Sequence, residues 1–513
     1  MTARRTSPSI AILGTGFAGL CVGIQLLRAG ITSFTIFEKA SGPGGTWRDN
    51  TYPGAACDIP SHFYSFSFDR RADWSRAYAR QPEILAYLEG CVDTYGLAPY
   101  IRYDTEITSL HYDDERNGWH LTTATGEQVP ADVVVSGLGQ LNRPAYPTIT
   151  GLHRFAGPAF HSARWDHDVD LTGQRVGVIG TGASAVQFIP PVARQAGHLT
   201  VFQRTPNWVI PKQDRAFSER TKARFARHPG LERSLRWLLY GVLEINFNTM
   251  RRRSKVGAAI EAAARMQLKQ QVPDPELRSK LTPDFPVGCK RVLIASDFFP
   301  SLAQPNTTVC TETITEIDPT GVRTIDGEHH DLDVLVFGTG FTSTEFLAPM
   351  EVIGRNGVDL NDAWRDGAEA YLGITVSGFP NLFLLYGPNT NLGHNSIVFM
   401  IEAQTRYLLH CIDQMQAGGL QWIDVRADAM SEFNTALQRA VDGTVWGTSC
   451  TSWYKNAAGK VTNNWPRHTY HYWWLTRRAD LSAYHSGRDG GMTQGNGADT
   501  TGSRSTLAFT TKR

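Results

Sequence analysis

The stretch that decides the fold begins Ile10-Ala-Ile-Leu-Gly-Thr-Gly-Phe-Ala-Gly19, continues as a helical segment to Arg28 and ends with Phe34-Thr-Ile-Phe-Glu38. An apolar run, a glycine turn, a helix and a second apolar run predict a βαβ unit. In the GxGxxG pattern the first glycine allows the tight turn, the second lets the backbone approach a pyrophosphate, and the third lets the helix pack closely on the strand. The stretch therefore predicts a dinucleotide-binding site at the N-terminus of a helix.

Glu38, at the end of the second apolar run, indicates which dinucleotide binds. A carboxylate at this position is expected to accept a hydrogen bond from a ribose 2′-hydroxyl, and it would repel a 2′-phosphate. The first site is therefore predicted to hold FAD, with NAD as the alternative, rather than NADP.

A second copy of the pattern follows in the middle of the chain. Arg175-Val-Gly-Val-Ile179 leads into Gly180-Thr-Gly-Ala-Ser-Ala185, and Leu199-Thr-Val-Phe202 is the expected partner strand. Where the first copy has an acid, this one continues Gln203-Arg204-Thr205, which places a guanidinium and a hydroxyl at the position of a 2′-phosphate. The second site is predicted to bind NADPH; the alternative is that Arg204 is an ordinary surface arginine.

The two units set the expected organisation of the chain. Its 513 residues are too many for one domain, because single hydrophobic cores stop growing at about 250–300 residues. The predicted fold is α/β, with two Rossmann-like dinucleotide-binding domains, one for FAD and one for NADPH, and a helical insertion. The expected ranges are 1–151 with 341–482 for the FAD domain, 152–213 with 285–340 for the NADPH domain, 214–284 for the helical insertion, and 483–513 for a disordered tail rich in Gly, Ser and Thr.

The charge pattern excludes some partners. Lys and Arg number 50 and Asp and Glu 49, so no overall charge favours nucleic acid or an anionic membrane. Residues 6–27 carry no charge, but their glycines and the strand that follows argue against a signal peptide or a membrane span. We expect no nucleic acid partner and no membrane span, and the oligomeric state stays open.

The spacing of the 7 cysteines bears on the cellular location and on which molecule accepts electrons from the predicted flavin. None stands in a CxxC spacing, so neither a disulfide framework, a metal site nor a redox dithiol is expected, and a reducing, cytoplasmic location is predicted. A flavoprotein that takes hydride from NADPH must pass its electrons on, and a disulfide reductase would need a paired dithiol near the flavin. Oxygen is therefore the predicted electron acceptor.

Four further motifs carry a resemblance to a known family. Phe155-Ala-Gly-Pro-Ala-Phe-His-Ser-Ala-Arg-Trp-Asp166 matches the fingerprint FxGxxxHxxxW(P/D) of type I Baeyer-Villiger monooxygenases. The segment from Gly44-Gly-Thr-Trp47 to Asp58, the segment Gly288-Cys-Lys-Arg291 and the segment Cys450-Thr-Ser-Trp-Tyr454 also match that family's patterns. The chain resembles these enzymes over residues 8–475.

The resemblance implies an FAD-dependent enzyme that uses NADPH and O2 to oxidise a ketone to an ester or lactone through a C4a-peroxyflavin. It implies that Arg291 stabilises the peroxide anion and the Criegee intermediate, and that Asp58 positions Arg291. An N-hydroxylating or sulfoxidising flavin monooxygenase is one alternative. A non-catalytic nucleotide-binding redox sensor is another, and the presence of Asp58, Lys290 and Arg291 weighs against it.

The remaining expected site residues follow from the glycine motifs and from matching family positions. His161 lies inside the fingerprint, but it is expected to couple the two domains and is not assigned as a general base. The residues expected at FAD are Gly14, Gly16, Gly19, Glu38, Gly45, Thr46, Trp47, Asp58, Tyr64, Gln140 and Ile397. The residues expected at NADPH are Gly180, Thr181, Gly182, Ser184, Ala185, Gln187, Arg204, Thr205, Lys290 and Arg291.

Overall fold

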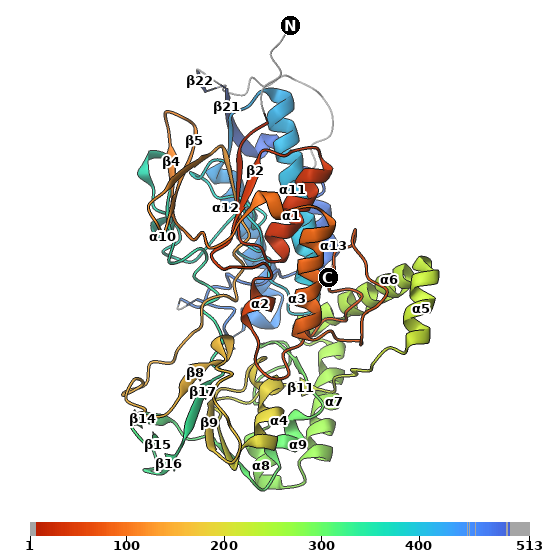
Figure 1. Cartoon of the computed structure of the whole chain (residues 1–513), viewed down its shortest axis with the longest axis vertical. Helices are drawn as coiled ribbons and strands as arrows, with labels where there is room; N and C mark the ends of the chain where they lie inside the picture. The colour runs from red at the N-terminus through yellow and green to blue at the C-terminus, as the bar shows by residue number, and fades with distance from the viewer. Residues whose placement is uncertain (1–6, 449, 451, 457, 489–490, 493–513) are drawn as a thin grey trace.

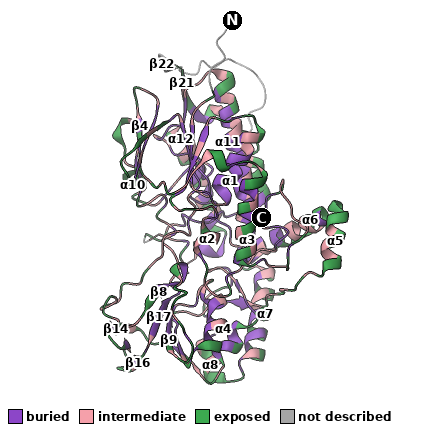
Figure 2. Ribbon diagram, in the orientation of Figure 1, coloured by how far each residue is buried: buried purple, intermediate pink, exposed green. Residues whose placement is uncertain are grey.

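The computed structural model describes residues 7–448, 450, 452–456, 458–488 and 491–492. Figure 1 shows two lobes: the ends of the chain, red and blue, fold together in one lobe, and the middle of the chain, yellow to green, forms the other. Each lobe is built around a parallel sheet of five strands. Figure 2 shows that the buried residues gather on these sheets and on the helices that cover them.

The sheet of the first lobe combines strands from distant parts of the chain. Its order is β19-β7-β1-β2-β3, and neighbouring strands run parallel. All residues of β1 and β7 are buried, as expected for central strands covered on both faces. Helix α1, which follows the first glycine turn, packs against α11. The bounds are β1 Ile10–Leu13, α1 Phe17–Arg28, β2 Phe34–Phe37, β3 Ile101–Arg102, β7 Val133–Ser136, β19 Leu382–Leu384 and α11 Ile397–Gly418.

The sheet of the second lobe has the order β13-β10-β9-β17-β8 and is also parallel. Helix α4 follows the second glycine turn and packs against α9. Both predicted βαβ units are present, and the predicted α/β fold with two Rossmann-like sheets is confirmed. The bounds are β8 Ala159–His161, β9 Arg175–Ile179, α4 Ala185–Gln195, β10 His198–Phe202, α9 Phe298–Leu302, β13 Thr307–Cys310 and β17 Val334–Phe337.

Smaller elements surround the two sheets. A four-stranded sheet of order β18-β4-β5-β6 and a three-stranded sheet of order β14-β15-β16 accompany the first and the second lobe. Their bounds are β4 Ile107–Asp113, β5 Gly118–Thr123, β6 Gln128–Ala131, β18 Glu351–Ile353, β14 Ile314–Asp318, β15 Gly321–Thr324 and β16 His329–Asp331. The other elements named below are α3 Gln81–Thr94, β11 Val209–Ile210, β12 Leu293–Ile294, α12 Ala427–Asp442 and α13 Thr469–Leu475.

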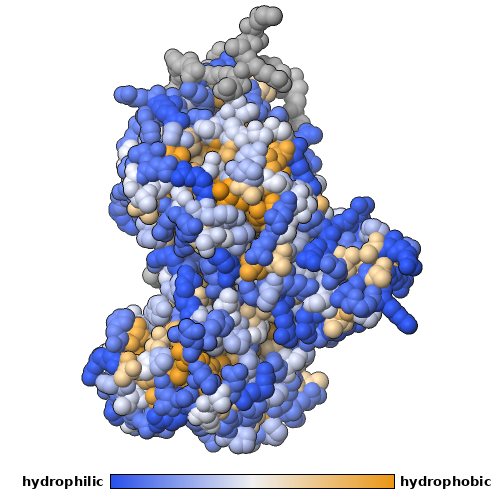
Figure 3. Space-filling model, viewed as in Figure 1, coloured by the Kyte–Doolittle hydropathy of each residue, from blue (hydrophilic) through white to orange (hydrophobic). Residues whose placement is uncertain are grey.

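Helices fill the predicted insertion: α5 Glu219–Arg227, α6 Pro229–Asn246, α7 Lys255–Gln271 and α8 Pro275–Lys280. Helices α5 and α6 project from the side of the molecule, whereas α7 and α8 lie on the second lobe (Figure 1). The projecting pair is largely hydrophilic, with a small apolar patch (Figure 3). In the described part of the chain, no helix is both long enough and apolar enough to cross a membrane.

The insertion is anchored to the first lobe by buried charges. Glu232 of α6 forms an ion pair with Arg70 at 3.0 Å. The Glu244 carboxylate accepts a hydrogen bond from Asn395 Nδ2 at 2.6 Å and lies 2.9 Å from His468 Nδ1. These contacts join the predicted helical insertion to the predicted FAD domain. The limits of the domains stay a prediction.

The prediction of a disordered tail from residue 483 is wrong for its first residues. Strand β21, Tyr484–Arg488, pairs antiparallel with β20, Trp422–Val425. The Tyr484 side chain is buried and its hydroxyl lies 2.9 Å from the Tyr407 hydroxyl. The burial of Tyr484 and the pairing with β20 therefore order this segment, although its composition is polar. Residues 493–513 of the predicted tail lie outside the described residues.

The expectation that the cysteines form no disulfide is also wrong. Cys289 and Cys450 are joined, with their Cα atoms 6.0 Å apart and a sequence separation of 161. Local spacing rules detect pairs such as CxxC, and they say nothing about two loops that meet only in the folded chain. The other described cysteines, Cys21, Cys57, Cys91, Cys310 and Cys411, are free and buried.

Candidate active site

One large cavity, of about 1330 Å³, receives both glycine turns. It is lined by the carboxyl ends of β1 and β9, where ligands bind in open parallel sheets. All but two of the predicted site residues line it; Gly19 and Ala185 lie behind the turns, where they pack helix on strand. The structure therefore brings the two predicted sites together.

The first glycine turn has the geometry that the sequence predicts. Gly14 has φ +92°, in the region that favours glycine. A Cβ atom on Gly19 would lie 1.8 Å from the Gly14 carbonyl oxygen. Helix α1 therefore packs so close to the turn that only glycine fits at position 19. A Cβ atom on Gly16 would have a single neighbour within 4 Å, Gly45 Cα at 3.9 Å. The second glycine thus leaves the backbone open to a ligand.

Glu38 is buried beside this turn and already has several donors. Its carboxylate accepts hydrogen bonds from Thr15 N at 2.9 Å, Thr15 Oγ1 at 2.7 Å and Ala40 N at 3.0 Å. Arg48 Nη1 forms an ion pair with it at 3.2 Å. Since two carboxylate oxygens accept about four hydrogen bonds and three are made here, the Glu38 carboxylate can still accept one from a ribose hydroxyl. Arg48 is a further residue of this site, and no sequence motif pointed to it.

Aromatic and amide side chains continue the lining beyond the turn. Trp47 Nε1 donates to the Tyr64 hydroxyl at 3.2 Å, and burial raises the pKa of Tyr64 well above its ordinary value. Gln140 Nε2 donates to the Tyr386 carbonyl at 2.9 Å. Gln140 Oε1 is buried and has no hydrogen-bond partner among the described residues. A buried acceptor of this kind calls for a donor from a bound molecule, and a flavin ring carries one.

Tyr386 was not predicted from the sequence. It lies at φ +61°, and its hydroxyl donates to Asn391 Oδ1 at 2.6 Å in the cavity wall. It directly precedes Gly387-Pro-Asn and lies 11 positions before the expected flavin residue Ile397, and no motif in the sequence pointed to it. Ile397 lines the same wall, as the first residue of α11.

The second glycine turn repeats the geometry of the first. Gly180 has φ +104°, and a Cβ atom there would lie 2.5 Å from the Gly338 carbonyl oxygen. A Cβ atom on Gly182 would have no described neighbour within 4 Å, so the backbone is open to a ligand. Gln187 faces the other lobe: its Oε1 accepts from Tyr52 OH and its Nε2 donates to Asp58 Oδ1, at 3.1 and 3.3 Å.

Two cations stand together where the 2′-phosphate of NADPH is predicted. Burial lowers the pKa of Lys290, and the neighbouring charge of Arg204 lowers it further. Neither cation has a carboxylate within 4.0 Å in the described part of the structure, and Lys290 Nζ lies 4.7 Å from the centre of the Phe285 ring. Like charges held close to each other are stabilised by an anion between them, so the pair fits a phosphate.

Arg291 is another cation of the cavity lining, and it is paired with a carboxylate. Its Nη2 lies 3.1 Å from Asp58 Oδ2, and 33% of its side chain is accessible, compared with 15% for Asp58. Burial alone would lower the pKa of Arg291, but Asp58 and, more weakly, Tyr454 outweigh it, and the net pKa is raised. Arg291 therefore stays positively charged while it faces the cavity.

His161 is buried at the end of β8, outside the described lining of the cavity. Its Nδ1 accepts a hydrogen bond from Ala163 N at 3.0 Å, and burial lowers its pKa to about 4. Its ring packs edge-on against Tyr146 and Phe341, which both line the cavity. This placement agrees with a structural role between the lobes.

Two Rossmann-like sheets whose glycine turns open on one cavity define a dinucleotide-dependent oxidoreductase. Residues 11–229 match the family described as pyridine nucleotide-disulphide oxidoreductase. The chain is 46% identical over 478 residues to a Baeyer-Villiger monooxygenase of Pseudomonas aeruginosa, covering 93% of this chain and 91% of the relative. A Baeyer-Villiger monooxygenase of Streptomyces coelicolor is 43% identical and covers 93% and 92% of the two chains.

A solved structure agrees with these relatives. The OTEMO complex with FAD and NADP matches with a TM-score of 0.85 at 25% identity, covering 94% of this chain and 100% of that one. Another relative, the phenazine N-monooxygenase PhzNO1 of Lysobacter antibioticus, is 35% identical and covers 77% and 81% of the two chains. The chain belongs to the Baeyer-Villiger monooxygenase family, and the resemblance found in the sequence is confirmed.

Proposed function

We propose that this protein binds FAD and NADPH and uses O2 to oxidise a ketone to an ester or lactone. The observation that carries the proposal is the half-buried Arg291–Asp58 pair, which faces the cavity that both glycine turns share. A permanent cation in that place suits a reaction in which negative charge develops on oxygen.

The chain's residues fit the two cofactors. The first turn with Glu38 suits a dinucleotide that carries a free 2′-hydroxyl, and Gln140 offers a buried acceptor to a flavin ring. Arg204 and Lys290 suit the 2′-phosphate of NADPH. Bound FAD supplies the two-electron carrier and the place where O2 is activated.

Arg291 then acts on the ketone. Its guanidinium is a rigid, always charged group with several N–H donors, and only Nη2 is directed to Asp58 in the described contacts. A cation beside the carbonyl oxygen stabilises the negative charge that develops there when the carbonyl is attacked. Asp58 fixes the direction of the guanidinium and is a positioning residue.

Aromatic side chains of the cavity wall lie close to this charge. Tyr454 is buried and Tyr386 is half-buried, both interact electrostatically with Arg291, and burial raises the pKa of Tyr454 to about 12. Both phenols therefore stay protonated at neutral pH. A wall of aromatic side chains lowers the local dielectric, which strengthens the effect of Arg291 on the reacting oxygen.

A second candidate is oxygen transfer to nitrogen or sulfur. It is favoured by the 35% identity to a phenazine N-monooxygenase. The same cofactors would serve, but the attacked atom would be an amine or thioether that bears no carbonyl. The Arg291–Asp58 pair has no evident role in that reaction, so we rank ketone oxidation first.

Product analysis separates the two. The FAD-loaded protein is given NADPH and O2 with a size-graded panel of ketones, and in parallel with a tertiary amine and a thioether. Ester formed in proportion to NADPH consumed is the expected result. N-oxide or sulfoxide without any ester would favour the second candidate, and hydrogen peroxide as the only product with every compound would contradict both. The predicted cytoplasmic location is part of the first proposal.

A further inference from the structure

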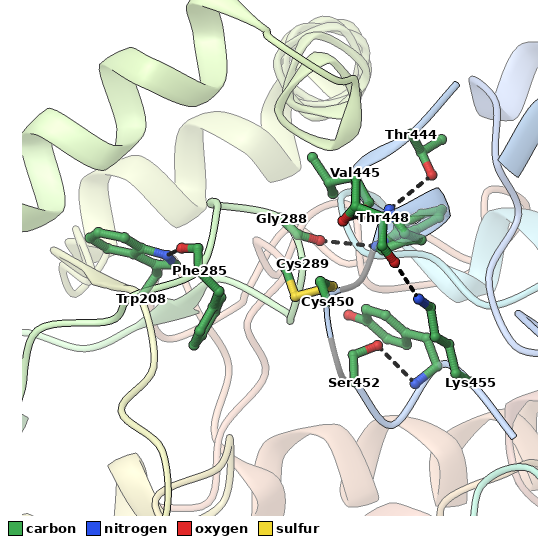
Figure 4. Close-up of a disulfide and its surroundings, with 12 residues drawn as sticks. Trp208, Phe285, Gly288, Cys289, Thr444, Val445, Thr448, Cys450, Ser452 and Lys455 are labelled. Atoms are coloured by element: carbon green, nitrogen blue, oxygen red, sulfur yellow. Dashed lines mark hydrogen bonds between the residues drawn. A yellow bond between two sulfur atoms is a disulfide. The ribbon is translucent and has the colours of Figure 1, made fainter. Parts of the chain in front are cut away.

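The Cys289–Cys450 bond joins two loops that both reach the candidate active site. Figure 4 shows it between the loop that carries Gly288 and the loop that runs from Thr444 to Lys455. Neither sulfur belongs to the described lining of the cavity. The bond is therefore not placed to take electrons from a bound flavin.

The residues next to the bond are those assigned to cofactor and substrate. Lys290 follows Cys289 directly and Arg291 comes one residue later. Beyond Cys450, Trp453 lines the cavity and Tyr454 interacts with Arg291. A change in the position of either cysteine is thus passed on to functional side chains within four residues.

Few other contacts hold the loop of Arg291. Cys289 N donates to Pro286 O at 3.1 Å and Leu293 N to Trp208 O at 2.8 Å. Between them, no backbone hydrogen bond is found for residues 290–292 within the described part of the chain. Apart from the Arg291–Asp58 ion pair and the packing of Val292, the position of these residues therefore depends on the two ends of the segment, and one end is the disulfide.

The partner loop supports the same end. Trp446, which is buried, donates from Nε1 to Gly288 O at 2.9 Å. Gly288 lies at φ +88°, and a Cβ atom there would be 2.9 Å from Thr249 O. Thr448 O accepts from Lys455 Nζ at 2.7 Å, which closes the partner loop on itself. Among the described residues, the hydrogen bond from Trp446 and the electrostatic interaction of Tyr454 with Arg291 also join the two loops, and the disulfide adds a covalent link.

We propose that the Cys289–Cys450 disulfide is a redox-sensitive tether that positions Lys290 and Arg291. The assignment of these two residues rests on the proposed function. Cys289 is buried, but Cys450 is partly accessible, so a dithiol can reach the bond from its side. Reduction takes two electrons and two protons: the S–S bond becomes two thiols, and the attacking dithiol becomes a disulfide. A reducing cytoplasm would open the tether, and oxidation would close it.

The test compares a double variant, Cys289→Ala with Cys450→Ala, with the wild type and with the control Cys411→Ala. Cys411 is free and buried in α11, away from the cavity lining. The folded wild-type protein is first exposed to oxidised glutathione and then unfolded and alkylated; mass spectrometry should find label on the 5 free cysteines, and on all 7 after reduction. Labelling of all 7 after exposure to oxidised glutathione would overturn the proposal.

The functional readouts are flavin content, NADP⁺ affinity and ester yield. We expect the double variant to keep FAD, to bind NADP⁺ more weakly and to lose about 10- to 100-fold in the rate of ester formation, because small misplacements of catalytic groups cost this much. Dithiol-treated wild type should behave in the same way, and Cys411→Ala should behave like untreated wild type. Equal NADP⁺ affinity in the double variant and the wild type would refute the tether. Labelling and NADP⁺ affinity do not require a ketone, so they test the tether even if no ester is formed.

Discussion

The third glycine of the first turn offers a sharp test of the fold. In Gly19→Ala the new Cβ would lie 1.8 Å from the Gly14 carbonyl oxygen and 3.0 Å from its carbonyl carbon. Carbon and oxygen atoms do not approach so closely, so α1 must move away from the turn by more than about 1 Å. The obstacle is backbone, and no side chain can rotate to make room.

The cost follows from the size of this movement. Overpacking of a well-packed core costs about 1–3 kcal/mol, and a backbone obstacle places Gly19→Ala at the upper end. A loss of about 3 kcal/mol lowers the melting temperature by about 6–12 °C for a domain of ordinary size. We also expect lower flavin content, because the displaced turn no longer presents its N–H groups to a pyrophosphate.

The assay is a thermal melt together with the flavin-to-protein absorbance ratio of the purified protein. Gly90→Ala is the matched control, because Gly90 lies inside α3 and a Cβ atom there would have no described neighbour within 4 Å. This control should be as stable as the wild type, or more stable by about 0.5–1 kcal/mol. A Gly19→Ala protein with wild-type melting temperature and full flavin content would refute the reasoning.

Three further changes test other parts of the molecule. Arg204→Ala should raise KM for NADPH by about 10- to 100-fold and leave KM for NADH nearly unchanged, since a lost charged hydrogen bond costs about 1.5–3 kcal/mol; equal changes for both would contradict the assignment. Burial lowers the pKa of His161 from 6.5 to about 4, so the unfolded chain binds the proton first and the free energy of unfolding falls as pH drops through this window. His161→Gln should reduce that fall, measured as urea midpoints at pH 5 and pH 7, and an unchanged pH dependence would contradict it. Glu244→Ala should lower the free energy of unfolding by about 3 kcal/mol, because buried partners in the first lobe lose their carboxylate; an unchanged urea midpoint would show that α6 is not anchored by it.

Local pattern was enough to predict the two nucleotide units, and most of the site residues expected from the sequence line one cavity. Each predicted residue stands at a fixed number of positions after a strand, as the glycine turns, Glu38 and Arg204 do. Because the geometry of a βαβ unit varies little, that sequence position also fixes the position in the folded protein. Arg291 and Asp58, 233 residues apart, were brought together by resemblance alone, and the structure places them 3.1 Å apart.

Contacts between distant loops could not be predicted in this way. The partners of Cys289 and of Glu244 lie more than 150 residues away, and nothing in their local sequence indicates them. Arg48 was not predicted at the site, because its ion pair with Glu38 depends on how the chain after Gly45 folds back. Strand β21 was missed because its pairing with β20 depends on tertiary context, which overrides a polar composition.

The most direct test of the central claim is the rate of ester formation by Arg291→Ala, measured beside its flavin spectrum. The account predicts a loss of about 10²- to 10³-fold with FAD still bound, because one preorganised donor to the developing oxyanion is removed. An Arg291→Ala enzyme that still converts a ketone to its ester at near wild-type rate would contradict the account.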